Sequence, residues 1–216
     1  YKPRGLVVSD RDEQNRETIF DHLPGNLPRL MTVGRLDLDS EGLLLMTNDG
    51  DLARHLELPS TGWSRKYRVR AQGQINESQL AALADGVTVD GIRYGQVIAK
   101  LDRQMASNAW LTVAIREGKN REIRRIMEYL GHKVSRLIRI SYGPFQLGDL
   151  EDGAIEQVKA RVLANQLGLG DGTLEASEKP TLSINKPAHK SSARRGKHAN
   201  HSGKPSRGNP HKTGRR

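Results

Sequence analysis

Gly34 to Gly50 reads GRLDLDSEGLLLMTNDG and joins a polar segment to an apolar one. The apolar run, Leu43 to Met46, is short enough for a buried central strand. The three acids before it, Asp37, Asp39 and Glu41, fall on a polar loop at the edge of a rigid core, where catalytic carboxylates are often held. In an extended chain Asp37 and Asp39 share one face about 7 Å apart, a spacing compatible with two-carboxylate glycosidic chemistry. A turn or helix cap is the alternative, and for any one acid considered by itself it is the better prediction.

Outward from this stretch, the hydrophobic period switches between two and about 3.6 residues, which indicates strands and helices mixed in one α+β domain. In residues 66–71, apolar Tyr67, Val69 and Ala71 alternate with three cations, so one face of this strand packs and the other suits phosphates. Further strands are predicted at 111–115 and at 87–89, the latter ending in an Asp90-Gly91 turn.

Three helices are predicted by spacing and capping residues. One covers 76–84, with Asn76 as its cap and Gly86 as its stop. A second carries Ile123, Ile126, Met127 and Leu130 on one face. A closing helix is marked by Ile155, Val158 and Val162 and ends near Gly168.

The segment 116–139 contains eight basic and three acidic residues. Its helix directs Arg121, Arg124 and Arg125 away from the apolar face. Guanidinium groups suit RNA phosphates and can stack on a splayed base. The alternative is a solvated helix face with pairs to Glu122.

Charge divides the chain into a nearly neutral body, residues 1–172, and a basic tail, residues 173–216. The tail holds 11 Lys and Arg against 2 acids, so it carries +9 of the total +10. It has no aromatic residue and few large aliphatics, so we expect it to be disordered. Its basic runs suit a polyanion, and a solubilising tail without a specific partner is the alternative.

The sequence contains no cysteine, which excludes disulfides, thiolate metal sites and a cysteine nucleophile. No apolar run approaches the roughly 20 residues needed to cross a bilayer, and residues from Tyr1 onward lack the apolar segment typical of a secretory signal. We therefore expect a soluble, cytoplasmic protein with no membrane partner. Because the chain starts at Tyr1, inside what looks like a motif, we expect it to be part of a longer one.

Five segments in order resemble the RsuA-type ribosomal pseudouridine synthases, and most closely the large-subunit synthase B type. They are YKPRG (1–5), GRLDLDSEGLLLMTNDG (34–50), KYRV (66–69), EGKNREIRR (117–125) and GHKVSRLIRISYGPF (131–145). The resemblance implies a mixed, largely antiparallel central sheet flanked by helices. It also implies site-specific isomerisation of uridine to pseudouridine in ribosomal RNA, expected to be 23S rRNA or an assembling subunit, by a monomer without metal or cofactor.

The resemblance also assigns roles to residues. Asp37 is the catalytic aspartate, Tyr67 stacks on the flipped base and assists removal of the C5 proton, and Lys119 pairs with the aspartate and keeps it ionised. The RNA-contacting candidates are Lys66, Arg35, Arg121, Arg124 and Arg125, with bracing of the loop as an alternative for Arg35. The expected pocket wall comprises Leu36, Leu137 and Ile138.

Two departures from the family pattern stand out. The N-terminal S4-type RNA-binding domain is absent from this chain, and Leu58 precedes Pro59 where relatives often have histidine. Two other functions stay open: a non-catalytic ribosome-assembly factor that uses the tail and the arginines, and a glycosidase that uses Asp37 and Asp39 as a carboxylate pair.

Overall fold

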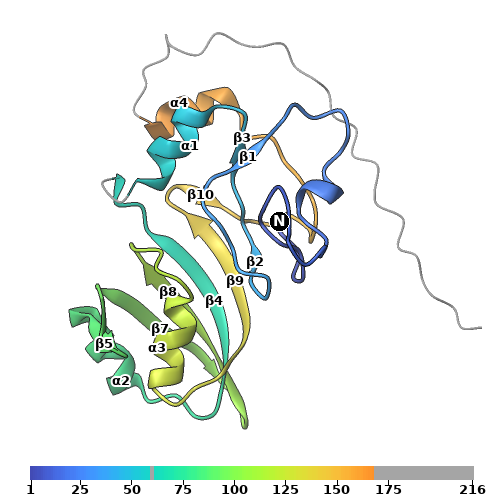
Figure 1. Cartoon of the computed structure of the whole chain (residues 1–216). Coiled ribbons are helices and arrows are strands. Elements are labelled where there is room, and N and C mark those ends of the chain that lie inside the picture. The colour runs from blue at the N-terminus through green and yellow to red at the C-terminus, as the bar shows by residue number, and fades with distance from the viewer. Residues whose placement is uncertain (59–60, 168–216) are drawn as a thin grey trace, which may run out of the picture. The chain divides into compact units, whose positions relative to one another are not determined.

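The computed structural model describes residues 1–58 and 61–167 (Figure 1). They belong to the first of two units into which the chain divides, with the boundary after Glu175. The predicted tail, 173–216, lies outside the described residues. None of the described helices has the length and apolar character needed to cross a membrane.

The central sheet has the strand order β10-β9-β4-β8-β7, with β2 added beside β9. All its neighbours run antiparallel except the β2–β9 pair, which is parallel. This confirms the predicted α+β class and the mixed, largely antiparallel sheet. The strands are β2 (Glu41–Gly42), β4 (Arg65–Gln72), β7 (Val97–Gln104), β8 (Asn108–Ile115), β9 (Val134–Tyr142) and β10 (Phe145–Gln146).

Alternation along β4 and β8 gives the sheet two unlike faces, as predicted. Val69 is paired with Leu111 and Tyr67 with Val113, and all four side chains are buried in one hydrophobic core. The residues between them in β4 are exposed. The face with the buried side chains is called the inner face below.

Helices cover the inner face. Helix α2 (Glu77–Ala82) begins at Asn76, whose side chain accepts from Ser78 N, and continues into η3 (Leu83–Asp85). Helix α3 (Glu122–Tyr129) buries Ile123, Ile126 and Met127 in the core and lies in front of the sheet in Figure 1. The hairpin of β5 (Val87–Val89) and β6 (Ile92–Tyr94) turns at Asp90 and Gly91, as predicted.

A second hydrophobic cluster lies beside the end of β9, and contains Val33, Leu43, Leu56, Tyr142 and Phe145. Helix α1 (Gly50–Glu57) contributes Ala53 and Leu56 to this cluster, and Leu163 of α4 (Ala160–Leu167) packs against it. The short elements η1 (Phe20–His22), β1 (Met31–Thr32) and β3 (Met46–Thr47) also belong to this half of the fold, where Phe20 and Met46 pack against the main core. The predicted closing helix is α4. It is shorter than expected, because Ile155 and Val158 precede its first residue.

The predicted central strand Leu43–Met46 is wrong. Two short strands replace it: β2 pairs with β9 and β3 pairs with β1, in different sheets. Between them Leu43 N donates to Arg139 O and Leu45 O accepts from Val33 N. The apolar run thus changes partners along its length, joining the central sheet to the second cluster.

Candidate active site

A buried lysine binds the backbone of the loop that carries Asp37. Lys2 is 3% exposed, and its Nζ donates to Ser40 O at 2.8 Å and to Leu38 O at 3.4 Å. The first residues also pair with β2, because Lys2 and Gly42 exchange two backbone hydrogen bonds. Burial lowers the pKa of Lys2 to about 8, against the opposing charges of Glu41, Asp37 and Asp39. The lysine therefore binds the loop backbone and lies close to its acids.

Two of the three acids in this loop are committed to arginines. Glu41 accepts from Arg136 Nε at 2.8 Å and from Nη2 at 2.9 Å, a two-pronged pair that keeps the pKa of Glu41 below its usual value. The Asp39 carboxylate lies 3.5 Å from Arg4 Nη2, in an exposed and therefore weak pair. Within residues 1–58 and 61–167, no cationic side chain lies within 4.0 Å of the Asp37 carboxylate.

Arg124 connects this loop to α3 on the inner face. Its Nη2 donates to Asp39 O at 3.1 Å and its Nη1 to Val134 O at 3.1 Å. Burial and the charge of Arg121 lower the pKa of Arg124, while the charges of Asp39 and Asp37 raise it. Arg124 thus braces the loop from the helix and supplies positive charge near Asp37, a role that differs from the predicted contact with RNA.

Tyr67 lies on the same inner face. It is 8% exposed and shares the main core with Leu36 and Leu137, two of the predicted wall residues. Because Tyr67 is so covered, stacking on a uracil requires neighbouring side chains to move. Ile138 is the next residue after Leu137 in β9 and pairs with Arg68, so it faces the opposite side of the sheet. The prediction that Leu137 and Ile138 form one wall is therefore wrong, because adjacent strand residues point to opposite faces.

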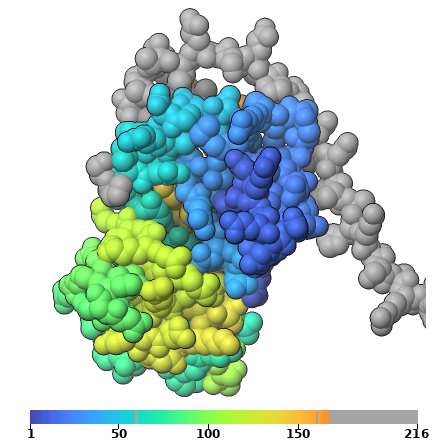
Figure 2. Space-filling model, in the orientation of Figure 1, coloured from blue at the N-terminus to red at the C-terminus, as the bar shows by residue number. Residues whose placement is uncertain are grey.

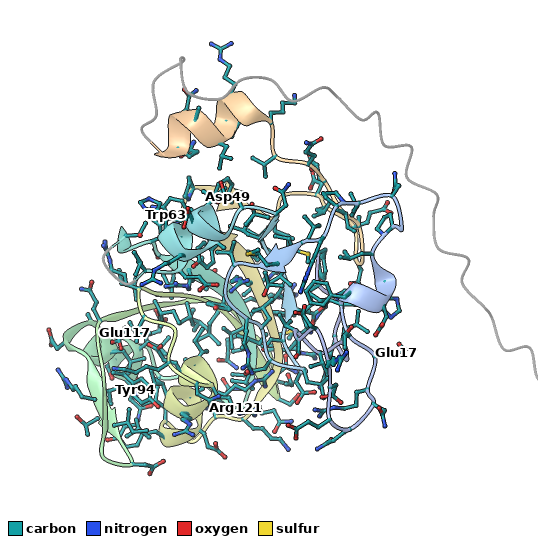
Figure 3. The ribbon with its side chains drawn as sticks, turned by 45° about the horizontal axis from the view of Figure 1, so that its top comes forward. Glu17, Asp49, Trp63, Tyr94, Glu117 and Arg121 are labelled. Atoms are coloured by element: carbon teal, nitrogen blue, oxygen red, sulfur yellow. The ribbon has the colours of Figure 1, made fainter. Side chains whose placement is uncertain are left out.

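Lys119 is paired differently from the prediction. Its Nζ forms an ion pair with Glu117 and donates to Arg93 O at 2.6 Å. Its ammonium lies 5.6 Å from the centre of the Tyr94 ring, and Gly95 N donates to the Glu117 carboxylate as well. Figure 3 shows Glu117 and Tyr94 near each other beside the β5–β6 hairpin. In this structure Lys119 joins that hairpin to the loop before α3, and its ion pair is with Glu117 instead of Asp37.

Glu122, at the start of α3, is an unpredicted buried acid. It is 3% exposed, and its carboxylate accepts from Lys119 N at 3.1 Å. Burial raises the pKa of Glu122 to about 7, assisted by the charge of Glu117 and opposed by that hydrogen bond and by the charges of Lys119 and Arg65. This acid holds the EGKN loop in place and titrates near neutral pH.

The remaining predicted RNA contacts fall into two groups. Arg35 and Arg121 are exposed, and Arg121 adopts a left-handed conformation (φ 51°) directly before α3. Arg125, one turn into the helix, is half-buried. Lys66, by contrast, lies on the sheet face away from Tyr67, because it is the neighbour of Tyr67 in β4.

The surface is recessed where these elements meet. Figure 2 shows a recess between the blue N-terminal part, the cyan part that includes α1 and the yellow-green segment that leads into α3. Two other hollows lie elsewhere, one beside α2 and α3 and one along residues 20–30. In the described part of the chain, no group of three or more His, Asp or Glu side chains could hold a metal ion.

Known proteins are similar to this chain in sequence and in fold. The family model described as RNA pseudouridylate synthase matches residues 1–129. A Rickettsia felis protein, named as an uncharacterized RNA pseudouridine synthase, is 49% identical over 163 residues, which is 76% of this chain and 70% of the relative. A crystal structure of a pseudouridylate synthase matches with a TM-score of 0.67 and 28% identity, and the match covers 76% of this chain and 70% of that one.

Relatives with a more specific name match over a smaller share of their length. Ribosomal large subunit pseudouridine synthase B of Haemophilus influenzae is 44% identical over 149 residues, 68% of this chain and 42% of the relative. The Salmonella typhi protein of the same name is 43% identical over 148 residues, 68% of this chain and 51% of the relative. The chain spans about half the length of these synthases, or less.

The fold, together with the Asp37 loop that Arg124 of α3 contacts, is that of an RNA-modifying isomerase. The chain belongs to the RNA pseudouridine synthase family, and the predicted resemblance to its RsuA-type members is confirmed.

Sequence reasoning missed the supporting residues Lys2, Arg4 and Glu122 and the bracing role of Arg124. Lys2 and Arg4 stand in the YKPRG segment, whose sequence indicates only the family resemblance. Their contacts reach across more than 30 residues to the loop, and no local period predicts such a contact. A signal was available for Glu122, since an acid in the first turn of a helix is a common capping residue.

Proposed function

We propose that this protein isomerises a uridine of large-subunit ribosomal RNA to pseudouridine, with Asp37 initiating cleavage of the glycosidic bond. The observation that carries the proposal is that the three acids of residues 37–41 differ in their ion pairs. Glu41 and Asp39 are paired with arginines, whereas Asp37 has no cation within 4.0 Å among the described residues and lies close enough to Lys2 and Arg124 for its charge to act on them. A carboxylate near cations but not neutralised by direct contact is ready to react.

The reaction is redox neutral. The C1′–N1 bond breaks, the uracil turns, a bond forms from C1′ to C5, C5 loses its proton and N1 gains one. Asp37 attacks or stabilises the ribose or base during cleavage. Tyr67, on the inner face, stacks on the detached uracil and assists removal of the C5 proton. In this proposal Arg35, Arg121 and Arg125 contact phosphates, while Arg124 and Lys2 position the loop.

Extraction of the uridine from its stack is part of the proposal, because a base inside a helix hides the reacting atoms. Flipping costs a few kcal/mol and costs least in an RNA loop. The recess in Figure 2 lies between the segments that would receive the base. Support for 23S rRNA as the substrate comes from the relatives named as large-subunit synthases, and a cytoplasmic site of action follows from that substrate. A monomeric state stays a prediction.

A matched pair of substitutions tests the role of Asp37. Asp37→Asn keeps the shape of the loop and its RNA contacts, so RNA affinity is expected to persist while product formation falls by about three orders of magnitude or more. Asp39→Asn, two residues away, breaks only the exposed pair with Arg4 and is expected to retain activity. Release of tritium from 23S rRNA labelled at C5 of uridine measures both.

The same assay separates the other functions. Isomerisation retained by Asp37→Asn would refute the assignment. Free uracil in the supernatant would indicate a glycosidase. A wild type with no product, together with an assembly defect that Asp37→Asn does not reproduce, would indicate a non-catalytic assembly factor. Mapping of pseudouridines in rRNA from cells lacking the protein identifies the uridine.

A further inference from the structure

The sheet face turned away from α2 and α3 carries a group of cations that the proposed mechanism does not use. We call it the open sheet face. It comprises Lys66, Arg68 and Arg70 of β4, Trp110 and Thr112 of β8, and Lys100 and Arg103 of β7. The five cations are all exposed, and their neighbours Tyr67, Val69 and Leu111 point into the core on the inner face. The open sheet face is therefore on the opposite side of the sheet from Tyr67.

Strand register places these cations around two central side chains. Trp110 is paired with Arg70 on one side and Arg103 on the other. Thr112 is paired in the same way with Arg68 and Lys100. Directly paired residues on antiparallel strands lie about 5 Å apart at Cβ, and alternate residues along one strand about 7 Å apart. The result is a grid with positive charges on β4 and β7, on either side of the two side chains of β8.

This concentration of charge is not a consequence of overall composition. Before Thr173 the sequence has 24 basic and 23 acidic residues, so the body is almost neutral. Yet β4, β7 and β8 together contain a single acid, Asp102, which accepts from Thr112 Oγ1 at 2.8 Å. The cations of β4 and β7 lie on either side of β8, about two strand spacings or roughly 10 Å apart, and repel one another across it. An unbalanced grid therefore carries a cost that an anionic ligand would relieve.

The aromatic residue on this face adds a second feature. The Arg68 guanidinium lies 4.8 Å from the centre of the Trp110 ring, within the range of a cation–π contact. Arg70 Nε donates to Asn108 Oδ1 at 3.1 Å, which fixes a second guanidinium beside it. The other tryptophan, Trp63, packs edge-on against Tyr142 and Phe145 in the second hydrophobic cluster. Trp110 instead supports a guanidinium plane on the polar face.

We propose that the open sheet face is a second RNA-binding surface, which takes single-stranded RNA through phosphate contacts of its cations and stacking of a base on Arg68 and Trp110. A guanidinium plane and an aromatic ring are the groups on which unpaired bases stack, and base stacking tolerates any sequence. The inference rests on the proposed function only in taking RNA as the polyanion. In this proposal the open sheet face anchors a single-stranded segment of the RNA that flanks the target uridine, while the uridine itself lies at Asp37.

An RNA without uridine isolates this surface from catalysis. In a Trp63→Phe variant of the full chain, Trp110 is the only tryptophan, and oligoadenylate of about 20 nucleotides is expected to quench its fluorescence by stacking. The triple variant Arg68→Gln, Arg70→Gln, Lys100→Gln is expected to bind this RNA at least about tenfold more weakly. The slope of log K against log salt should become less steep by about 2, because each of the three lost phosphate contacts contributes roughly 0.7.

A matched triple serves as the control. Arg11→Gln, Arg29→Gln, Arg54→Gln removes the same charge from exposed positions outside the central sheet, and a smaller loss of affinity is expected. Equal losses from both triples, or no quenching of Trp110, would overturn the proposal. So would polyglutamate binding that matches oligoadenylate in affinity and depends on the same three cations, because that result indicates an acidic protein as the partner.

The failure of this inference and that of the proposed function can be told apart. Oligoadenylate binding is expected to be unchanged in Asp37→Asn, and the isomerisation assay does not use oligoadenylate. Absence of pseudouridine, with oligoadenylate binding that depends on Arg68 and Arg70, would remove the proposed function and keep this surface.

Discussion

The buried carboxyl group of Glu122 is expected to make the stability of the fold depend on pH. Its pKa is raised to about 7 by burial, from about 4.5 in the unfolded chain. The folded state therefore binds more protons than the unfolded state between these values. The contribution of Glu122 to stability is complete below about pH 4.5 and is lost as the pH rises through 7.

The Glu122→Gln variant tests this sign. Glutamine keeps an oxygen that can accept from Lys119 N but cannot ionise, so the variant is expected to gain stability over the wild type as the pH rises from 5 to 8. The gain has an upper bound of about 3 kcal/mol, from the shift in pKa. Urea unfolding at several pH values measures it. Glu128→Gln, at an exposed position of α3, should show no such trend, and a flat difference for Glu122→Gln would contradict the argument.

At the residue level, the sequence identified candidates better than it identified their contacts. Asp37 could be selected only through the GRLD motif, since composition and spacing left it equal to Asp39 and Glu41. The arginine pairs that distinguish the three acids bring Arg4 and Arg136 to the loop from distant parts of the chain. For the same reason the predicted Lys119–Asp37 pair was wrong for this structure, because folding places Glu117 and Arg93 O beside the ammonium.

At the element level, strands with alternating side chains and helices with caps were predictable, and short strands were not. β4, β8, α2 and α3 follow from local periods and capping residues. β2 has only two residues, and its place beside β9 is set by tertiary packing. The prediction for Leu43–Met46 was wrong because an apolar run has the same sequence pattern whether it forms one strand or pairs with two different strands along its length.

Gly42 is the residue that lets β2 approach β9. Its φ is +102°, and a Cβ atom there would lie 2.9 Å from Arg139 N and closer still to Arg139 O. Gly42→Ala is therefore expected to cost roughly 3 kcal/mol or more, from the left-handed backbone and from the overlap, and to displace the Asp37 loop. Thermal unfolding and the tritium-release assay measure these effects.

Gly25→Ala provides the control, because nothing lies within 4 Å of its added Cβ. We expect it to keep the stability and activity of the wild type. A Gly42→Ala protein as stable and as active as Gly25→Ala would show that β2 does not need this close approach.

For the whole molecule, the charge distribution supports a division between RNA capture and the proposed chemistry. The body is nearly neutral overall but concentrates cations on the open sheet face and around the Asp37 loop, whereas residues 173–216 carry 11 basic residues and 2 acids. Single-stranded RNA bound through phosphates releases about 0.7 counterion per contact, so binding by the tail should weaken steeply with salt. The catalysis proposed for Asp37 depends on local geometry, which salt affects less.

Removal of residues 173–216 is therefore expected to lower RNA affinity and to make the dependence of log K on log salt less steep by at most about 8, the value for eleven phosphate contacts of Lys and Arg. The single-turnover rate of isomerisation at saturating RNA should stay unchanged, because the elements that hold Asp37, Tyr67 and Arg124 all precede residue 168. A variant whose tail is replaced by Gly and Ser of equal length controls for length. If the rate at saturation fell with the charges while affinity did not, the tail would act in catalysis, and the division between capture and chemistry would be wrong.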